Sequence, residues 1–353
     1  MSEIEEAAEA TPKLGYKAYL WHFDAPVIGA AVLDGIAGFG QGIAGFGLGD
    51  GSIGLRDLAM PDKPVTERRR PHANGLLSFV TAPDGRGFIS GGDDGKLVYT
   101  ALDAEPRLLA ERPRKWIEQI AVAPEGGLIA FGAAKEAGLV DLRGKVNASL
   151  SDHPSTVAGL AFNPKGKRLA VAHYGGVTLW WAKDGAQTPK RLTWSGSHVA
   201  LSWSPNGRFI MTATQENELH GWRTDDFADM RMSGYPAKPR SLSWSADGKW
   251  LASSGAESVI CWHCAGKGPM GSMPLEMNRG HLVMAVAFHP KLNIVASGDA
   301  EGGLTLGRIS DERSIPLEKI SRAPIACLNW SRDGRWLAIG CEDGAAALID
   351  FES

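Results

Sequence analysis

Residues 199–210 read VALSWSPNGRFI, and residues 239–251 and 326–337 repeat the pattern as PRSLSWSADGKWL and ACLNWSRDGRWL. Each segment is an alternating apolar strand, a turn that ends in glycine, a basic residue and a second apolar strand. Alternation with a period of two is typical of a half-buried β-strand. Self-similarity at a fixed spacing indicates an array of supersecondary units, so the repeat decides the fold.

Weaker copies of this segment can be followed along the chain by the turn residue. They place it at Gly85, Gly126, Gly166, Gly207, Gly248, Leu292 and Gly334, with spacings of 41, 40, 41, 41, 44 and 42 residues. A degenerate copy around Gly35 precedes them, which gives eight units. Most of these turns carry Pro-X-Gly or a close variant. Proline presets φ and glycine accepts a positive φ, as a tight hairpin turn requires.

Each unit continues with a polar turn, a third apolar strand and a weaker fourth strand that begins at or near proline, as at Pro106 and Pro316. Proline is harmless on an outer edge strand, where no N–H is needed. Four strands in about 40 residues is the period of a propeller blade. The chain is therefore predicted to be all-β: a single closed β-propeller of four-stranded blades. We expect eight blades, or seven if the Gly-rich first unit is not a true blade.

The two ends of the chain predict how the ring closes. The last unit stops at Phe351, after its third strand, and residues 17–23 (KAYLWHF) alternate ahead of the first unit. We expect this N-terminal strand to become the missing outer strand of the last blade, which leaves no open edge in the ring. Residues 1–13 are expected to be a disordered acidic tail, and residues 14–353 the propeller.

The pattern resembles the WD40 repeat family over nearly the whole chain. The Gly-His pair of that family stands at Gly280-His281, and single histidines occupy a similar place at His72, His153 and His198. The Trp-Asp pair is eroded, for example to Trp262-His263. The resemblance implies a hydrogen-bond network of His, turn Asp and third-strand Trp that stiffens each blade, with His72 and Asp94 as one candidate pair. It also implies that the links between blades form the usual partner site.

Composition argues against several classes of protein. Four scattered cysteines and an acidic start without a secretory pattern favour a reducing compartment, so we expect a cytoplasmic location. No segment approaches the ~20 apolar residues of a membrane span. A formal charge of −3 argues against a dedicated nucleic-acid binder.

Three motifs could carry chemistry, and each has a structural explanation that we prefer. Cys261 and Cys264 form a C-x-x-C, but the segment coincides with a third strand, whose successive residues point to opposite faces. Residues 40–45 match G-x-G-x-x-G, but no helix is expected after them. The recurrent histidines are expected to be structural. We predict no catalytic residue, no cofactor and no metal site.

Basic residues precede the first strand of several units, in links that a propeller gathers on one face. The fourth and fifth units do not share this bias and carry Ser155, Thr156 and Ser197 instead. Arginine makes forked hydrogen bonds to carboxylates, and an exposed tryptophan can anchor a partner. The predicted partner-binding residues are Arg69, Arg70, Arg114, Lys115, Trp116, Lys238, Arg240, Arg279 and Arg322.

These features favour a non-catalytic protein-interaction scaffold, which presents a rigid propeller face to a partner protein or peptide. A basic face favours an acidic partner segment. The alternatives are an enzyme or metal-handling propeller with a site in the central channel, and an RNA-associated scaffold that uses the same basic face.

Overall fold

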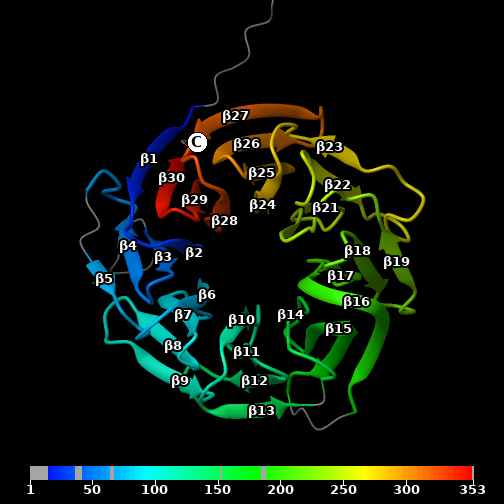
Figure 1. The fold of residues 1–353 in the computed structure, drawn as a ribbon, viewed down its shortest axis with the longest axis horizontal. Coiled ribbons are helices and arrows are strands. Elements are labelled where there is room, and N and C mark those ends of the chain that lie inside the picture. The colour runs from blue at the N-terminus through cyan, green and yellow to red at the C-terminus, as the bar shows by residue number, and fades with distance from the viewer. Residues whose placement is uncertain (1–14, 36–41, 64–66, 152, 184–187, 352–353) are drawn as a thin grey trace, which may run out of the picture.

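The computed structural model describes residues 15–35, 42–63, 67–151, 153–183 and 188–351. Their 30 strands form sheets arranged radially around a central axis (Figure 1), and these residues contain no helix. The predicted all-β propeller is therefore confirmed. The acidic tail predicted at residues 1–13 lies outside the described residues.

Six of the sheets have four strands each, and three of these six come from the first half of the chain. These three sheets consist of β2 (Val27–Asp34), β3 (Gly42–Leu48), β4 (Ile53–Asp57) and β5 (Glu67–Arg69); β6 (Leu76–Thr81), β7 (Gly87–Gly92), β8 (Lys96–Ala101) and β9 (Arg107–Glu111); and β10 (Ile117–Val122), β11 (Ile129–Ala133), β12 (Glu136–Val140) and β13 (Val146–Leu150).

Three more four-stranded sheets come from the second half of the chain. They consist of β20 (Leu242–Trp244), β21 (Trp250–Ser253), β22 (Val259–His263) and β23 (Leu275–Met277); β24 (Val283–Phe288), β25 (Ile294–Asp299), β26 (Gly303–Arg308) and β27 (Arg313–Lys319); and β28 (Ile325–Trp330), β29 (Trp336–Cys341), β30 (Ala345–Asp350) and β1 (Lys17–His22).

The seventh sheet of the described residues has six strands and corrects the expected blade count. It consists of β14 (Gly159–Phe162), β15 (Arg168–Trp181), β16 (Lys190–Trp203), β17 (Phe209–Thr214), β18 (Leu219–Arg223) and β19 (Asp229–Met232). The 14-residue β16 pairs with β15 through its first part and with β17 through its second part, so the fourth and fifth sequence units share one sheet.

The expectation of eight separate blades is therefore not met: the described residues form seven sheets, and the seventh holds the fourth and fifth units as two four-stranded halves that meet in β16. The Gly-rich first unit is not the cause, because it forms a sheet of its own, β2–β5. The merger instead follows from the absence of a loop between the fourth and fifth units. Within the shared sheet, the N–H of Ala182 donates to the carbonyl of Lys167 (2.9 Å). The two ends of β15 therefore lie side by side, and β15 turns back near Gly175 and Gly176, both of which have positive φ.

The N-terminal strand closes the ring as predicted. β1 pairs antiparallel with β30 over six residues, from Lys17 opposite Asp350 to His22 opposite Ala345. Figure 1 shows the two strands side by side at the outer edge of the last blade. The hydroxyl of Tyr16 also donates to the carbonyl of Leu317 in the preceding sheet (3.1 Å). The closing strand is thus held by two blades.

The repeated segment folds into a turn capped by its own side chains. In residues 204–209, Ser204 Oγ accepts the N–H of Phe209 (2.9 Å), and Asn206 Oδ1 accepts the N–H of Arg208 (3.0 Å). Ser245 with Asp247 and Ser331 with Asp333 make the same pair of bonds. The turn glycines of six units have φ between 63° and 84°, as predicted. In the unit that lacks this glycine, His289 Nδ1 accepts the N–H groups of Lys291 and Leu292 instead.

The apolar core lies between neighbouring sheets, so each blade is stabilised mainly by the next one. One cluster joins Val27 and Phe46 of the first unit to Trp336 and Leu348 of the last. The repeated tryptophans Trp203 and Trp244 are only half-buried. Their rings cover the edge of the core, which lowers the expected cost of removing them.

Candidate partner-binding face

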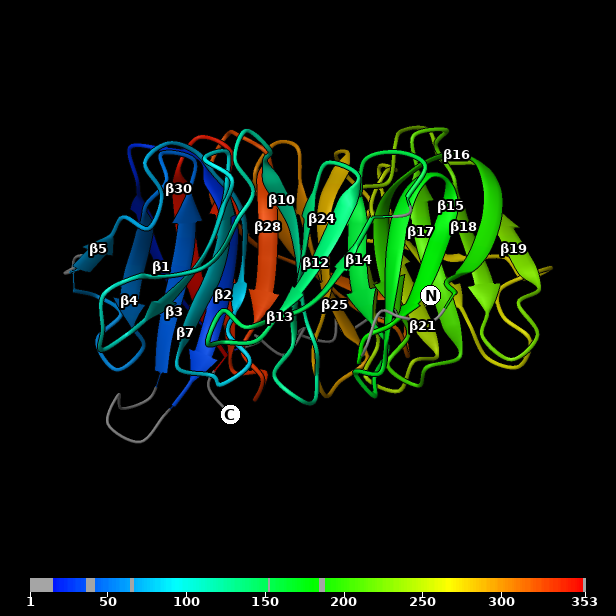
Figure 2. The same ribbon diagram turned by 90° about the horizontal axis from the view of Figure 1, so that it is seen from below.

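The links between units and the turns between second and third strands lie on the same face of the ring. This follows from the antiparallel order of each sheet, in which alternate connections return to the same edge. Figure 2 shows the strands running between the two faces of the ring. We call this face the upper face. The turns that contain the repeated Pro-X-Gly lie on the opposite, lower face.

Glycine contacts fix the connections of the upper face to one another. The N–H of Arg112, in the link after β9, donates to the carbonyl of Gly95 in the turn of the same unit (2.8 Å). Gly95 has φ of 76°, and a Cβ at this position would lie 2.3 Å from the carbonyl oxygen of Arg112. The same arrangement recurs at Gly51, Gly302 and Gly344. The face is therefore a set of braced loops.

Buried polar networks support these loops from below. His72 Nδ1 lies 3.1 Å from Asp94 Oδ1, and its Nε2 lies 2.8 Å from Ser90 Oγ, so the predicted His72–Asp94 pair is confirmed. Burial lowers the pKa of His72, although Asp94 opposes this effect. In another unit, the indole N–H of Trp180 donates to His153 Nε2 (3.0 Å).

One of the histidines predicted to be structural is not buried. His281, in the preserved Gly-His pair, has an exposed side chain. Asn278 takes the buried place instead, and its side-chain amide donates to Ser297 Oγ (2.8 Å). The residue that is buried and hydrogen-bonded here, Asn278, thus lies three residues before His281 of the family motif.

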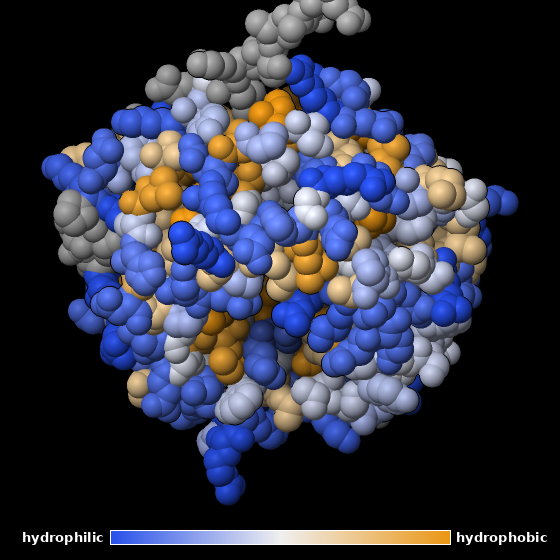
Figure 3. Space-filling model, turned by 45° about the horizontal axis from the view of Figure 1, so that its top comes forward, coloured by the Kyte–Doolittle hydropathy of each residue, from blue (hydrophilic) through white to orange (hydrophobic). Residues whose placement is uncertain are grey.

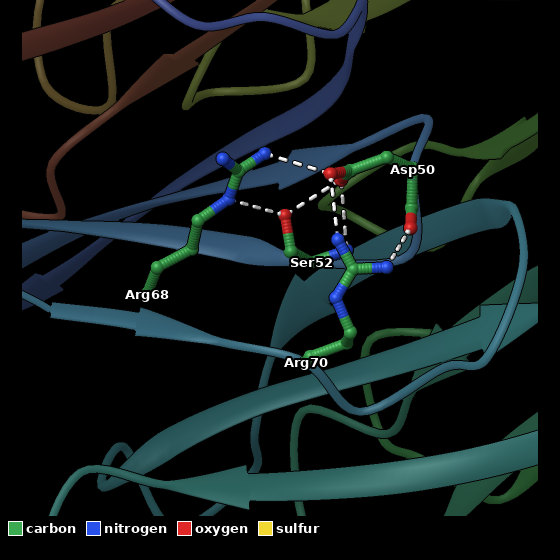
Figure 4. A network of polar contacts seen from close by, with 4 residues as sticks. All are labelled: Asp50, Ser52, Arg68 and Arg70. Atoms are coloured by element: carbon green, nitrogen blue, oxygen red, sulfur yellow. Dashed lines mark hydrogen bonds and ion pairs between the residues drawn. The ribbon is translucent and has the colours of Figure 1, made fainter.

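Several of the predicted basic residues are neutralised by acidic side chains close to them. Asp50 Oδ2 lies 2.7 Å from Arg68 Nη2 and 3.0 Å from Arg70 Nη2, as Figure 4 shows. Asp50 Oδ1 also accepts a hydrogen bond from the hydroxyl of Ser52 (2.6 Å). Partial burial would raise the pKa of Asp50, but the bonds from Ser52 and the two arginine charges lower it overall.

Glu136 forms a second such cluster in the third unit. It accepts from Arg112 Nη2 (2.7 Å), and Lys115 Nζ lies 3.7 Å from its other oxygen. Arg279 is paired with Glu276 (2.8 Å). Arg69 donates to the carbonyls of Leu102 and Ala104 in the neighbouring unit. The predicted ring of free positive charge is therefore interrupted by local ion pairs.

Four predicted basic residues have no ion pair within the part of the chain that the structure describes. They are Arg114, Lys238, Arg240 and Arg322; Arg114, Arg240 and Arg322 are exposed and Lys238 is half-buried. Trp116, two residues after Arg114, has 59% of its surface exposed. In the view of Figure 3 the molecular surface is mostly hydrophilic, with separate small apolar patches. These five residues are therefore the members of the predicted site that are available to a partner.

The other candidate motifs are accounted for by the structure of the blades. Cys261 and Cys264 are both buried, and burial raises the pKa of each thiol to about 12. Residues 36–41 lie outside the described residues, and Gly42–Leu48 forms strand β3. No group of three or more His, Cys, Asp or Glu side chains is positioned to hold a metal ion among the residues that the structure describes. No helix in the described residues is long and apolar enough to cross a membrane.

One feature of the upper face lies outside the residues predicted from the sequence. Tyr174, Thr193, Trp194 and Ser195 line a hollow of about 510 Å³ in the shared six-stranded sheet. The available signal was the absence of basic residues in the links of the fourth and fifth units, which marks this part of the face as different.

Fold and repeat together define a β-propeller built from repeated four-stranded units with a braced loop face. Residues 286–353 match a family model described as the anaphase-promoting complex subunit 4 WD40 domain, and residues 144–181 and 231–263 match the WD domain, G-beta repeat. These matches, together with the fold, support a WD40 repeat β-propeller family for this chain.

Curated relatives are similar at low identity and are much longer than this chain. A Periodic tryptophan protein 2 homolog from Neurospora crassa is 22% identical over 311 residues, which cover 79% of this chain and 34% of that protein. Telomerase protein component 1 from Mus musculus is 25% identical over 201 residues, which cover 55% of this chain and 7% of that protein. The chain thus matches about a third or less of each of these two relatives.

A solved structure supports the fold. The computationally designed Ika8 protein has a TM-score of 0.76 and 17% identity, and the match covers 93% of this chain and 97% of that protein. This similarity concerns the arrangement of the strands alone.

Proposed function

We propose that the protein is a non-catalytic scaffold that binds a partner protein or peptide through its upper face. The observation that carries the proposal is the bracing of the upper-face loops by glycine contacts, as between Gly95 and Arg112. A surface that is already ordered loses little conformational entropy when a partner binds. The proposed location is the cytoplasm.

The partner would dock on the exposed basic residues and Trp116. Arg114, Lys238, Arg240 and Arg322 have no ion pair among the described residues, and such cations favour an acidic segment of the partner. Trp116 offers a large exposed ring of the kind that anchors many interfaces. The clusters at Asp50 and Glu136 hold Arg70 and Lys115, respectively, and would brace the face.

The test is affinity purification from the native host with wild type and the double variant Arg114→Glu/Trp116→Ala. A matched control is Lys165→Glu/Leu292→Ala, because both residues are exposed and lie in turns of the lower face. We expect one discrete protein to copurify with wild type and the control and to be lost from the upper-face variant. A partner retained by both variants would refute this location of the site.

Two further results would favour the alternatives. Copurifying RNA whose binding falls steeply with salt would favour the RNA-associated scaffold. Stoichiometric metal in the purified protein, or turnover that depends on channel residues, would favour the enzyme or metal-handling propeller.

A further inference from the structure

The shared sheet gives the upper face a second region of different chemistry. In other units a separate loop links one blade to the next, whereas here β16 continues from the outer edge of one unit to the inner strand of the next. The register slips between Tyr174 and Gly176, opposite residues 193–197 of β16. This irregularity leaves the ring of Tyr174 60% exposed at the edge of the hollow.

Trp194 is a rigid wall of this hollow. Its indole stacks on the imidazole of His220, with ring centroids 3.9 Å apart and an interplanar angle of 16°. Its N–H donates to Glu218 Oε1 (3.3 Å). One face and the polar edge of the indole are therefore occupied within the protein, while Trp194 also lines the hollow.

The charge beside the hollow is negative. Glu216, in the turn after β17, has an exposed side chain, and both of its carboxylate oxygens lie 3.2 Å from the N–H of Ser197. No ion pair to Glu216 occurs among the described residues. Glu218 is buried and paired with Arg231 (2.7 Å). The charges of Glu218 and Arg231 cancel each other, so Glu216 supplies the uncompensated negative charge.

Two aromatic rings that line the hollow, with the carboxylate of Glu216 beside it, form a site for a cation. Cations bind over the faces of tryptophan and tyrosine, and the planar guanidinium of arginine also stacks on them. His220 adds no competing charge at neutral pH, because burial lowers its pKa to about 4. We propose that this hollow binds an arginine side chain displayed by a partner protein, placed against Trp194 and Tyr174 and compensated by Glu216.

This proposal goes beyond the scaffold function proposed above, because it names a second site and a probe of the opposite charge. Full-length protein is titrated against fluorescein-labelled hexa-arginine, hexa-lysine and hexa-glutamate, with binding followed by fluorescence anisotropy. We expect hexa-arginine to bind more tightly than hexa-lysine. Loss of a ring in Tyr174→Ala or Trp194→Ala is expected to weaken hexa-arginine binding by about tenfold.

The variants differ in how far they perturb the fold. Trp194→Ala also removes the support of His220, so Tyr174→Ala and Glu216→Gln, at exposed positions, decide the result. Glu216→Gln is expected to weaken hexa-arginine binding by about threefold or more. The matched control, Glu125→Gln, removes an exposed carboxylate from a lower-face turn and is expected to change affinity less than about twofold.

Unchanged affinity in Tyr174→Ala and Glu216→Gln would overturn the proposal, as would an equal loss in Glu125→Gln. Trp116→Ala separates the two sites. Its hexa-arginine affinity should equal that of wild type, and a loss there as large as in Tyr174→Ala would show that arginine binds elsewhere on the face. A negative result in the affinity purification would not affect the prediction for the hollow, because the two experiments test different residues with different probes.

Discussion

Removal of the closing strand should destabilise the whole ring. The perturbation is deletion of residues 1–22, which removes β1 and leaves β30 as an outer edge. Residues 345–350 of β30 are buried in the intact ring, so the deletion would expose an apolar strand to water. The deletion should destabilise two blades, because the hydroxyl of Tyr16 also donates to the carbonyl of Leu317 in the preceding sheet.

The contacts of Trp21 set a lower bound on the cost. Its ring lies edge-on to Phe46 with centroids 5.3 Å apart, and the guanidinium of Arg56 lies 4.2 Å from the ring centroid. A fully buried Trp→Ala change costs roughly 3–5 kcal/mol, so we expect about 2–3 kcal/mol for the half-buried Trp21. The deletion should cost more, since it also removes the six-residue pairing with β30.

The assay is urea unfolding followed by tryptophan fluorescence and circular dichroism. Three proteins are compared: the full chain, the deletion of residues 1–14, which spares β1, and the deletion of residues 1–22. The shorter deletion should unfold like the full chain, and the longer one at clearly lower urea. Coincident unfolding curves for both deletions would refute the closure argument. Trp21→Ala should fall between them.

Three further comparisons test other parts of the fold. Gly95→Ala should cost about 2–4 kcal/mol in thermal unfolding, because its Cβ would meet the carbonyl of Arg112. Gly85→Ala, with a similar φ and open space, should cost only about 1 kcal/mol, and equal costs would disprove the bracing contact. Burial holds the pKa of His220 at about 4, below the ordinary 6.5, so the unfolded chain binds the proton first. The resulting stability is present above pH 6.5 and is lost as the pH falls towards 4. Urea midpoints of wild type should therefore fall more steeply over this window than those of His220→Phe. Trp244→Ala should cost about 2–3 kcal/mol in urea unfolding, and no effect would mean that its ring contributes nothing to the core.

The fold was predictable because its signals are local and recur. The Ser-X-Asp-Gly turn, the alternating strands and the unpaired strand at residues 17–23 each specify their own geometry. The merger of the fourth and fifth units was not predictable in the same way. It depends on whether the chain between Trp194 and His198 leaves the sheet, and backbone pairing across Tyr174 decides that in three dimensions.

The candidate site was predictable in position but only partly in chemistry. The sequence placed Arg70, Lys115 and Arg279 on the upper face, and the structure shows each of them paired with a carboxylate. Asp50 and Glu276 belong to the unit before each link, and Glu136 begins β12 of the next unit, so each pairing depends on the path that the link takes in three dimensions. Tyr174 and Trp194 are far less conspicuous in the sequence than Trp116, because only the shared sheet brings them to one hollow.

The pairing of β1 with β30 also sets the order of events during synthesis. The contact between Tyr16 and Leu317 spans 301 residues, so β1 must wait until these residues have been synthesised before the contact can form. At about 5–20 residues per second, this wait lasts roughly 15–60 s. During that time the earlier blades can form, while an apolar, unpaired N-terminal segment stays open to other strands. Slower translation would lengthen this interval, and β1 would remain a target for chaperones that bind extended apolar segments.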